Sequence, residues 1–336
     1  MGNNHIKKGC DNVCTAVSFN ACNHYFGRNL DLEKRYDESI AITPRNFIMK
    51  YKSGEIERKH YAFIGTATVI ENYPLFYDAT NEHGLSMAGL NFVGNAYLNN
   101  TVKNGSINLA PYELIPYILG KCKNVEESIN MLKNITLINI PFNSHLQNSE
   151  LHWIIADKKE CIVFEYMKNG AKIHNNPIGI LTNNPPFEYQ IMNLNNYLML
   201  SASEPKNTFS EYLDLFPYSR GMGAIGLPGD NSSMSRFVRC CFNKMNSIIP
   251  DTELESVTQF FHILSSVEQI EGSVIVGNKY EKTQYTSCCN TEKGIYYYKT
   301  YGNSRISAVS MHNENIDADQ LMVYKMVFTP AVLCIN

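Results

Sequence analysis

The chain has 336 residues, of which 44% are hydrophobic and 18% charged, with a formal net charge of −3 and a pI near 6.3. This composition is ordinary for a globular protein and argues against non-specific nucleic-acid binding, which needs a basic surface. No stretch approaches about eighteen consecutive apolar residues, so no membrane span is expected. The polar start lacks the apolar core of a signal peptide, which makes the cytoplasm the default compartment.

Alternating and helical apolar patterns predict strands near both ends of the chain, with helices in the middle and late middle. Runs of antiparallel-looking strands with segregated helices indicate α+β layers rather than alternating βαβ units. We therefore expect a single domain from residue 14 to the end. The predicted strands are 15–19, 24–30, 61–69, 151–156, 161–166, 294–301 and 322–328, and the predicted helices are 111–119, 125–132, 235–246 and 253–265.

The first of these strands begins with a cysteine, and the second carries two opposite charges. Cys14, Arg28 and Asp31 place a thiol, a guanidinium and a carboxylate within eighteen residues. A thiol is a strong nucleophile only as the thiolate, and a nearby fixed cation lowers its pKa. This trio suggests covalent acyl transfer, although Arg28 and Asp31 alone are also typical of an ion-paired strand end. Alternation puts Arg28 and Asp31 on opposite faces of the strand.

The other cysteines give little sign of disulfides or of a metal site. The chain contains ten cysteines but is long and rich in core-forming residues, which favours reduced thiols. The vicinal pairs Cys240-Cys241 and Cys288-Cys289 have neither a CxxC partner nor a complementary histidine pair, so neither zinc nor another metal is expected.

Three further polar residues lie in segments that are unusual for packing alone. Asn91 ends the glycine-rich apolar run 84–92, where it is either a turn cap or part of an oxyanion site. Asn183 precedes Asn184 and two prolines, which exclude helix and predict a loop. Arg236 lies in the first turn of a predicted helix, where the helix dipole disfavours a cation unless it has another partner.

Together these segments resemble the choloylglycine hydrolase family, which contains bile salt hydrolases and penicillin V acylases. The resemblance runs from Cys14 to about Tyr324 and implies the N-terminal-nucleophile hydrolase fold, a four-layer αββα sandwich of two antiparallel sheets between helical layers. The motifs that carry it occur in the family's order: CTA at 14–16, FGRNLD at 26–31, TPRNF at 43–47, GLNF at 89–92, LTN at 181–183, GLPGD at 226–230, SRF at 235–237, QYTSC at 284–288 and GIYYY at 294–298.

The resemblance also implies a role for each polar residue of these motifs. Cys14 is the nucleophile, which forms a thioester acyl-enzyme, and its own α-amine is the base, with an ordinary pKa of about 7.7–8.0. Asp31 holds the amine and Arg28 stabilises the thiolate. The implied oxyanion hole is formed by the side chain of Asn183 and the backbone N–H of Asn91, while Arg236 supports the network around Cys14.

The thirteen residues before Cys14 depart from the family pattern, because bile salt hydrolases usually begin Met-Cys. We expect residues 1–13 to be a propeptide or N-terminal extension that is removed by cleavage after Val13. Two alternatives are a later translation start and an inactive, unprocessed homologue that only binds ligand.

The choice of substrate lies between conjugated bile salts and penicillin V. Asn91 favours bile salts, since the family's penicillin acylases carry Tyr at that position. The resemblance places Leu30, Ile70, Phe76 and Tyr77 in an apolar substrate pocket, although each is also an ordinary core residue type. Tyr77 is bulkier than expected there.

Arg220 is predicted to pair with the substrate's carboxylate or sulfonate, or else to be a surface arginine. We lean towards glycine over taurine conjugates. The remaining alternatives are an acyl-homoserine-lactone acylase, a non-catalytic binding protein and a vicinal-thiol redox or metal protein. The family commonly forms homotetramers and needs no cofactor, and the expected partner is the small-molecule substrate alone.

Overall fold

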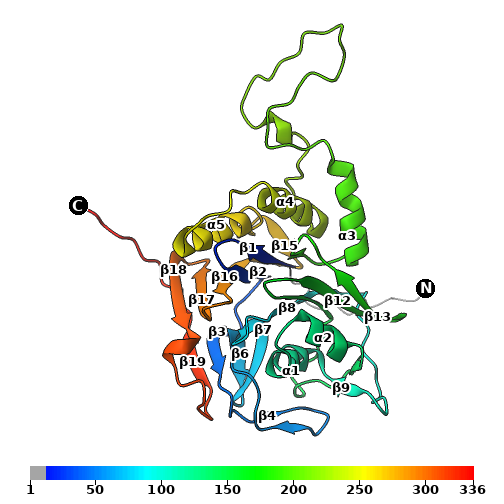
Figure 1. Ribbon diagram of the computed structural model, residues 1–336, viewed down its shortest axis with the longest axis vertical. Helices are drawn as coiled ribbons and strands as arrows, with labels where there is room; N and C mark the ends of the chain where they lie inside the picture. The colour runs from blue at the N-terminus through cyan, green and yellow to red at the C-terminus, as the bar shows by residue number, and fades with distance from the viewer. Residues whose placement is uncertain (1–12) are drawn as a thin grey trace.

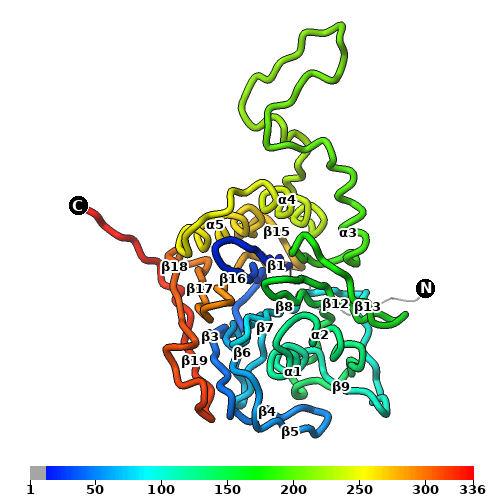
Figure 2. The backbone as a smooth tube through the Cα atoms, in the orientation of Figure 1, coloured from blue at the N-terminus to red at the C-terminus, as the bar shows by residue number. Residues whose placement is uncertain are grey.

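The computed structural model describes residues 13–336 and consists of two large antiparallel sheets stacked face to face, with helices on their outer faces (Figure 1). The backbone trace in Figure 2 shows the same layers, with β1 near the middle of the molecule. Of the predicted extension 1–13, only Val13 lies within the described residues.

The first sheet carries the N-terminal strands between two groups of later ones. Its hydrogen-bonded order is β14-β1-β2-β16-β17-β18, with β15 paired to β16. The neighbouring strands run antiparallel throughout. The strands are β1 (Val13–Asn20), β2 (His24–Leu32), β14 (Ile180–Leu181), β15 (Val274–Val276), β16 (Lys279–Asn290), β17 (Ile295–Thr300) and β18 (Asn303–Ser310).

The second sheet is built mainly from the first half of the chain. Its order is β13-β12-β11-β8-β7-β6-β3-β19, again antiparallel between neighbours. Its strands are β3 (Ser39–Thr43), β6 (Phe63–Ile70), β7 (Tyr73–Asn81), β8 (Ser86–Asn91), β11 (Leu151–Ala156), β12 (Cys161–Met167), β13 (Gly170–Asn175) and β19 (Met322–Lys325). Two small ribbons pair β4 (Met49–Lys50) with β5 (Ile56–Glu57) and β9 (Ile107–Leu109) with β10 (Ile135–Leu137).

The helices cover the outer faces of the sheets. The helix α1 (Leu114–Lys121) packs on β7 and β8, with α2 (Val125–Leu132) beside it, whereas α4 (Ser233–Met245) and α5 (Glu253–Ser265) cover β1, β2 and β16 (Figure 1). Side-chain oxygens of Asn124, Ser232 and Thr252 accept N–H groups at the starts of α2, α4 and α5, which satisfies donors that the helix leaves unpaired.

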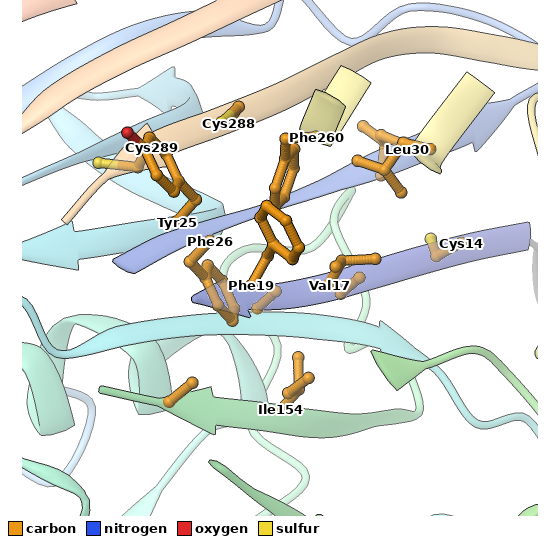
Figure 3. Close-up of a cluster of buried hydrophobic side chains, with 14 of the residues drawn as sticks. Cys14, Val17, Phe19, Tyr25, Phe26, Leu30, Ile154, Phe260, Cys288 and Cys289 are labelled. Carbon is orange, nitrogen blue, oxygen red and sulfur yellow. The ribbon is translucent and has the colours of Figure 1, made fainter. Parts of the chain in front are cut away.

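Two apolar cores hold these layers together. One lies between the sheets and beneath α4 and α5, and the other lies between the second sheet and α1. Cys14 belongs to the first core, at the end of β1 away from Phe19 and Phe260 (Figure 3). The nucleophile candidate therefore lies at the margin of a rigid, close-packed interior.

The predicted four-layer αββα fold is confirmed. The predicted helices 125–132 and 253–265 coincide with α2 and α5, while the strand predicted at 322–328 is shorter and ends at Lys325. Between residues 13 and 336, no helix has the length and apolar character needed to cross a bilayer. The described cysteines are free thiols, and no group of three or more possible metal ligands occurs among the described residues.

One segment departs from the compact body. Residues 194–231, here called the arm, connect α3 (Phe187–Asn193) to α4 and project away from the sheets as a long loop (Figures 1 and 2). Its large apolar side chains are mostly in solvent, including Phe209, Tyr212, Phe216 and Tyr218, each at least 79% exposed. Monomeric proteins rarely expose so much apolar surface without a partner.

Candidate active site

The pairing of β1 with β2 determines the geometry of the site. Cys14 lies opposite Leu30, and Val13 lies opposite Asp31. Side chains of directly opposed residues share a face of a sheet, so the Cys14 thiol points to the same face as Arg28 and Leu30. Asp31 points to the other face, towards the layer of α4 and α5. The predicted alternation is therefore present: the guanidinium accompanies the thiol, and the carboxylate lies behind the main chain.

Cys14 is almost completely buried, with 2% of its surface exposed. Its backbone N–H donates to Oδ1 of Asn183 at 2.8 Å, and its carbonyl accepts from Nη1 of Arg236 at 2.6 Å. Burial raises the pKa of the Cys14 thiol, and the opposing effects of Arg28 and Arg236 do not overcome it. In the chain that retains Val13, the thiol is consequently protonated at neutral pH and needs a base before it can attack.

Arg28 spans the two sheets and is fully buried. Its Nη1 donates to the carbonyl oxygens of Tyr77 at 3.0 Å and Gly89 at 2.6 Å. Its Nη2 is buried without a hydrogen-bond partner within residues 13–336. Burial disfavours the cation, but the neighbouring acidic groups of Cys14, Tyr285 and Asp78 raise the pKa of Arg28 on balance. Arg28 is thus a fixed positive charge beside the thiol.

Asp31 lies behind Cys14 with one oxygen engaged. Its Oδ1 accepts the hydroxyl of Thr283 at 2.6 Å, whereas Oδ2 is buried with no hydrogen-bond partner in the described chain. Burial raises the pKa of Asp31 to about 6, against the effects of Arg236, Thr283 and Arg28. An unpaired buried carboxylate oxygen beside the Val13–Cys14 bond is well placed to accept from an amine at Cys14.

Asn183 and Arg236 are joined in one polar network around the Cys14 main chain. Besides Cys14, Arg236 contacts Oγ1 of Thr15 at 2.6 Å and Oδ1 of Asn183 at 2.8 Å. The Asn183 Nδ2 donates to the carbonyl of Asn91 at 3.0 Å. The structure therefore gathers five of the sequence-predicted residues around Cys14: Arg28, Asp31, Asn91, Asn183 and Arg236.

A cavity of about 490 Å³ opens beside Cys14, within the range usual for small-molecule sites. Cys14, Arg28 and Asn91 line it, and so do the charged Arg35 and Asp37. The predicted pocket residues Leu30, Ile70, Phe76 and Tyr77 all line it, together with Val69, Leu75, Tyr112, Ile115, Leu151 and Trp153. This wall suits a large apolar acyl group.

Arg220 is not brought to this cavity. It lies in the arm with 94% of its side chain exposed, and it forms an ion pair with Glu204 of the same segment. The prediction that Arg220 meets the substrate's anionic group is therefore not supported within one chain. The distance that the arm reaches was not visible in the sequence.

Sequence reasoning missed Glu281, which is buried on β16 next to Asp31. Its Oε1 accepts the Val13 N–H at 2.6 Å, and its Oε2 is buried without a hydrogen-bond partner among the described residues. Burial raises the pKa of Glu281 to about 8, although the bond from Val13 acts in the opposite direction. The sequence did offer one signal for Glu281, since its carboxyl lies two residues before Thr283 in a β-prone run.

Asp78 was also missed and is the buried countercharge of Arg28. It accepts hydroxyls of Tyr285 at 2.8 Å, Ser287 at 3.2 Å and Tyr296 at 2.5 Å, while the Arg28 N–H donates to Oγ of Ser287 at 3.1 Å. Three hydroxyl donors keep this carboxylate satisfied between the sheets. The tyrosines of the QYTSC and GIYYY motifs could have indicated a buried acceptor for their hydroxyl groups.

The αββα layers, with a thiol near the start of a central strand, define an N-terminal-nucleophile hydrolase fold. The model of the choloylglycine hydrolase family of linear amide C–N hydrolases matches residues 14–324, and the chain belongs to that family.

Its relatives include a bile salt hydrolase/transferase of Lactiplantibacillus plantarum, which is 50% identical over 94% of this chain and 97% of that protein. A bile salt hydrolase/transferase of Clostridium perfringens is 37% identical over 96% of this chain and all of the relative.

Solved structures give the same assignment. A mutant of the conjugated bile acid hydrolase of Clostridium perfringens superposes with a TM-score of 0.90 at 36% identity, covering 96% of this chain and all of the other. The penicillin V acylase of Agrobacterium tumefaciens has a TM-score of 0.72 at 17% identity, covering 93% and 91% of the two chains. The second match shows the shared fold alone.

Proposed function

We propose that this enzyme hydrolyses the amide bond that joins a bile acid to glycine or taurine, with Cys14 as nucleophile. The observation that carries the proposal is the meeting of a buried thiol, the Arg28 cation and an apolar cavity of about 490 Å³ at the end of β1. The relatives named as bile salt hydrolases support the substrate class.

The proposed reaction proceeds through a thioester. The α-amine of Cys14 takes the thiol proton, and Sγ attacks the amide carbonyl while Asn183 and the Asn91 N–H stabilise the oxyanion. The carbon–nitrogen bond breaks, and the departing amine takes the proton from the α-ammonium. Water then attacks the thioester and gives a proton to the α-amine, which returns it to the departing sulfur as the bile acid leaves.

This mechanism requires cleavage after Val13. While the Val13–Cys14 bond is intact, the Cys14 nitrogen is an amide whose N–H donates to Asn183, and an amide is not a base. Cleavage converts it to an amine beside Oδ2 of Asp31, the buried oxygen that lacks a hydrogen-bond partner in the described chain. Intact-mass measurement of the native protein tests this step, since a mature enzyme whose first residue is not Cys14 would contradict it.

Substrate choice is tested by comparing glycocholate, taurocholate and penicillin V with the same purified protein. We expect both conjugates to be hydrolysed, glycocholate faster, and penicillin V slowly. The apolar wall around Ile70 and Phe76 supports a steroid acyl group. Much faster turnover of penicillin V would overturn the proposal, and cleavage of long acyl-homoserine lactones alone would favour the signal-degrading alternative.

The proposal includes a homotetramer that works in the cytoplasm. The exposed apolar arm supports assembly, because burying its aromatic side chains against a second copy removes them from water. A reducing compartment suits a thiol nucleophile and the free thiols of the described cysteines. Light scattering with size-exclusion chromatography measures the oligomeric state.

A further inference from the structure

A buried histidine–glutamate pair lies behind the oxyanion segment and takes no direct part in the proposed chemistry. His152 of β11 and Glu165 of β12 are both completely buried, with Nδ1 of His152 at 3.3 Å from Oε1 of Glu165. Burying polar groups is costly unless they are hydrogen-bonded. Its position beside the site therefore calls for an explanation.

The pair binds both ends of the loop that carries Asn183. His152 Nε2 donates to the carbonyl of Thr182 at 2.8 Å, immediately before Asn183. Oε1 of Glu165 accepts the N–H of Phe187 at 2.8 Å, where α3 begins. One side-chain pair thus fixes the backbone on either side of the proposed oxyanion donor.

The same histidine also contacts the strand end that carries Asn91. Its ring stacks on Phe92, with centroids 4.3 Å apart and planes 7° from parallel, and both side chains are fully buried. His152 is therefore the residue that touches the neighbours of both Asn91 and Asn183, which come from segments ninety residues apart in the chain.

The Thr182 carbonyl requires a proton on Nε2 of His152, because a carbonyl can only accept. Burial opposes the charge of Glu165, but His152 and His174, whose Nε2 lies 3.3 Å from Oε2, lower the pKa of its carboxyl to about 2. The ionised Glu165 therefore holds the Phe187 N–H through a charge-assisted hydrogen bond, which is stronger than one between neutral groups.

We propose that His152, held by Glu165, is a positioning residue that sets Asn183 and Asn91 at the distance the developing oxyanion requires. The inference rests on the proposed function, because it assumes that these two asparagines stabilise that oxyanion. Neither His152 nor Glu165 touches the substrate cavity, so loss of the pair alters the placement of the donors rather than substrate binding.

The test uses the mature enzyme that begins at Cys14, with the variants His152→Gln, Glu165→Gln and both together. The double variant leaves neither member of the pair without a matched neutral partner, so it is expected to fold even if a single variant does not. We expect kcat to fall about tenfold to a hundredfold with KM nearly unchanged, less than the roughly 10²–10³ loss for a deleted oxyanion donor. Alkylation of Cys14 by iodoacetamide should keep its wild-type rate.

His60→Gln is the matched control, because His60 is also buried and its ring nitrogens contact the carbonyl oxygens of Phe47 and Tyr61, away from the cavity. It should alter stability without lowering kcat. If the folded double variant retains wild-type kcat, or if alkylation falls together with kcat, the positioning role is wrong.

A substrate-independent measurement separates this inference from the proposed function. Hydrogen–deuterium exchange across 182–187 should speed up in the double variant and stay unchanged in His60→Gln. Absence of bile-salt hydrolysis by the wild type would refute the proposed function. Unchanged hydrogen–deuterium exchange in the double variant would instead refute the positioning role of His152 and Glu165.

Discussion

The paired strands β1 and β2 and the arm at 194–231 differ in how far their side chains are exposed to solvent. Every residue of β2 is buried, and its charged side chains are retained only because partners from the adjacent layers surround them. The arm is held at its base by a bond from the Ser201 N–H to the Gly223 carbonyl at 2.9 Å, and it leaves its aromatic residues in water. A buried environment suits the reactive thiol, whereas the exposed arm suits contact with a partner.

The largest expected effect comes from the nucleophile itself. Cys14→Ala should reduce hydrolysis of glycocholate by at least about 10⁴-fold, because no acyl-enzyme forms. Mass spectrometry after rapid quenching measures this directly, since the wild type should show the cholyl adduct on its first residue. Cys22→Ala is the control, because Cys22 is exposed and distant from the cavity. Full activity of Cys14→Ala would refute the thioester mechanism.

Loss of the oxyanion amide should cost less. Asn183→Ala is expected to lower kcat by roughly 10²–10³ with a smaller effect on KM. Asn195→Ala removes an exposed amide at the base of the arm, whose Nδ2 contacts the Met192 carbonyl, and should leave kcat unchanged. An equal loss of kcat in the two variants would mean that the arm affects reactivity as much as the residues around Cys14 do.

The raised pKa of Glu281 predicts that stability depends on pH in the chain that retains Val13, which intact mass identifies. The pKa of Glu281 is raised from 4.5 to about 8, so the folded state binds the extra proton, and stability falls as the pH rises through that interval. Urea unfolding should therefore show a loss of a few kcal/mol between about pH 5 and pH 8. Glu281→Gln should remove most of that loss, whereas the exposed Glu271→Gln should not.

The smallest effect is expected in the arm. Phe216→Ala, at a side chain 79% exposed, should change the free energy of unfolding by no more than about 0.5 kcal/mol in dilute monomer. Phe260→Ala, at a fully buried position, should cost about 3–5 kcal/mol. Similar losses at concentrations where the protein assembles would show that a second copy covers the arm.

The fold was predictable because its signals are local and repeated. Alternation identified β1, β2, β11 and β12, and helical spacing gave α2 and α5 their observed limits. Residues inside ordered motifs, such as Arg28 and Asn183, were also accessible, since the motifs fix where a side chain lies along a strand. The family match extends the same information across most of the chain.

The remaining features depend on contacts between distant segments. Glu281 meets Val13 across 268 residues, and Asp78 meets Tyr296 across 218, so no local pattern shows either pair. Arg220 shows a different limit of sequence reasoning. Its exposure fits the alternative of a surface arginine, because the chain between α3 and α4 extends away from the sheets before it returns, and no local pattern shows how far.

The register that sets Val13 opposite Asp31 has an electrostatic consequence. While Val13 is attached, it shields a carboxyl with a pKa of about 6 and occupies one oxygen of another with a pKa of about 8. Removal of Val13 would introduce a cation at Cys14, which favours the ionised form of both carboxyls. The proposed cleavage would therefore act as an electrostatic switch as well as a chemical one, because it adds a positive charge close to two carboxyls whose pKa values burial has raised.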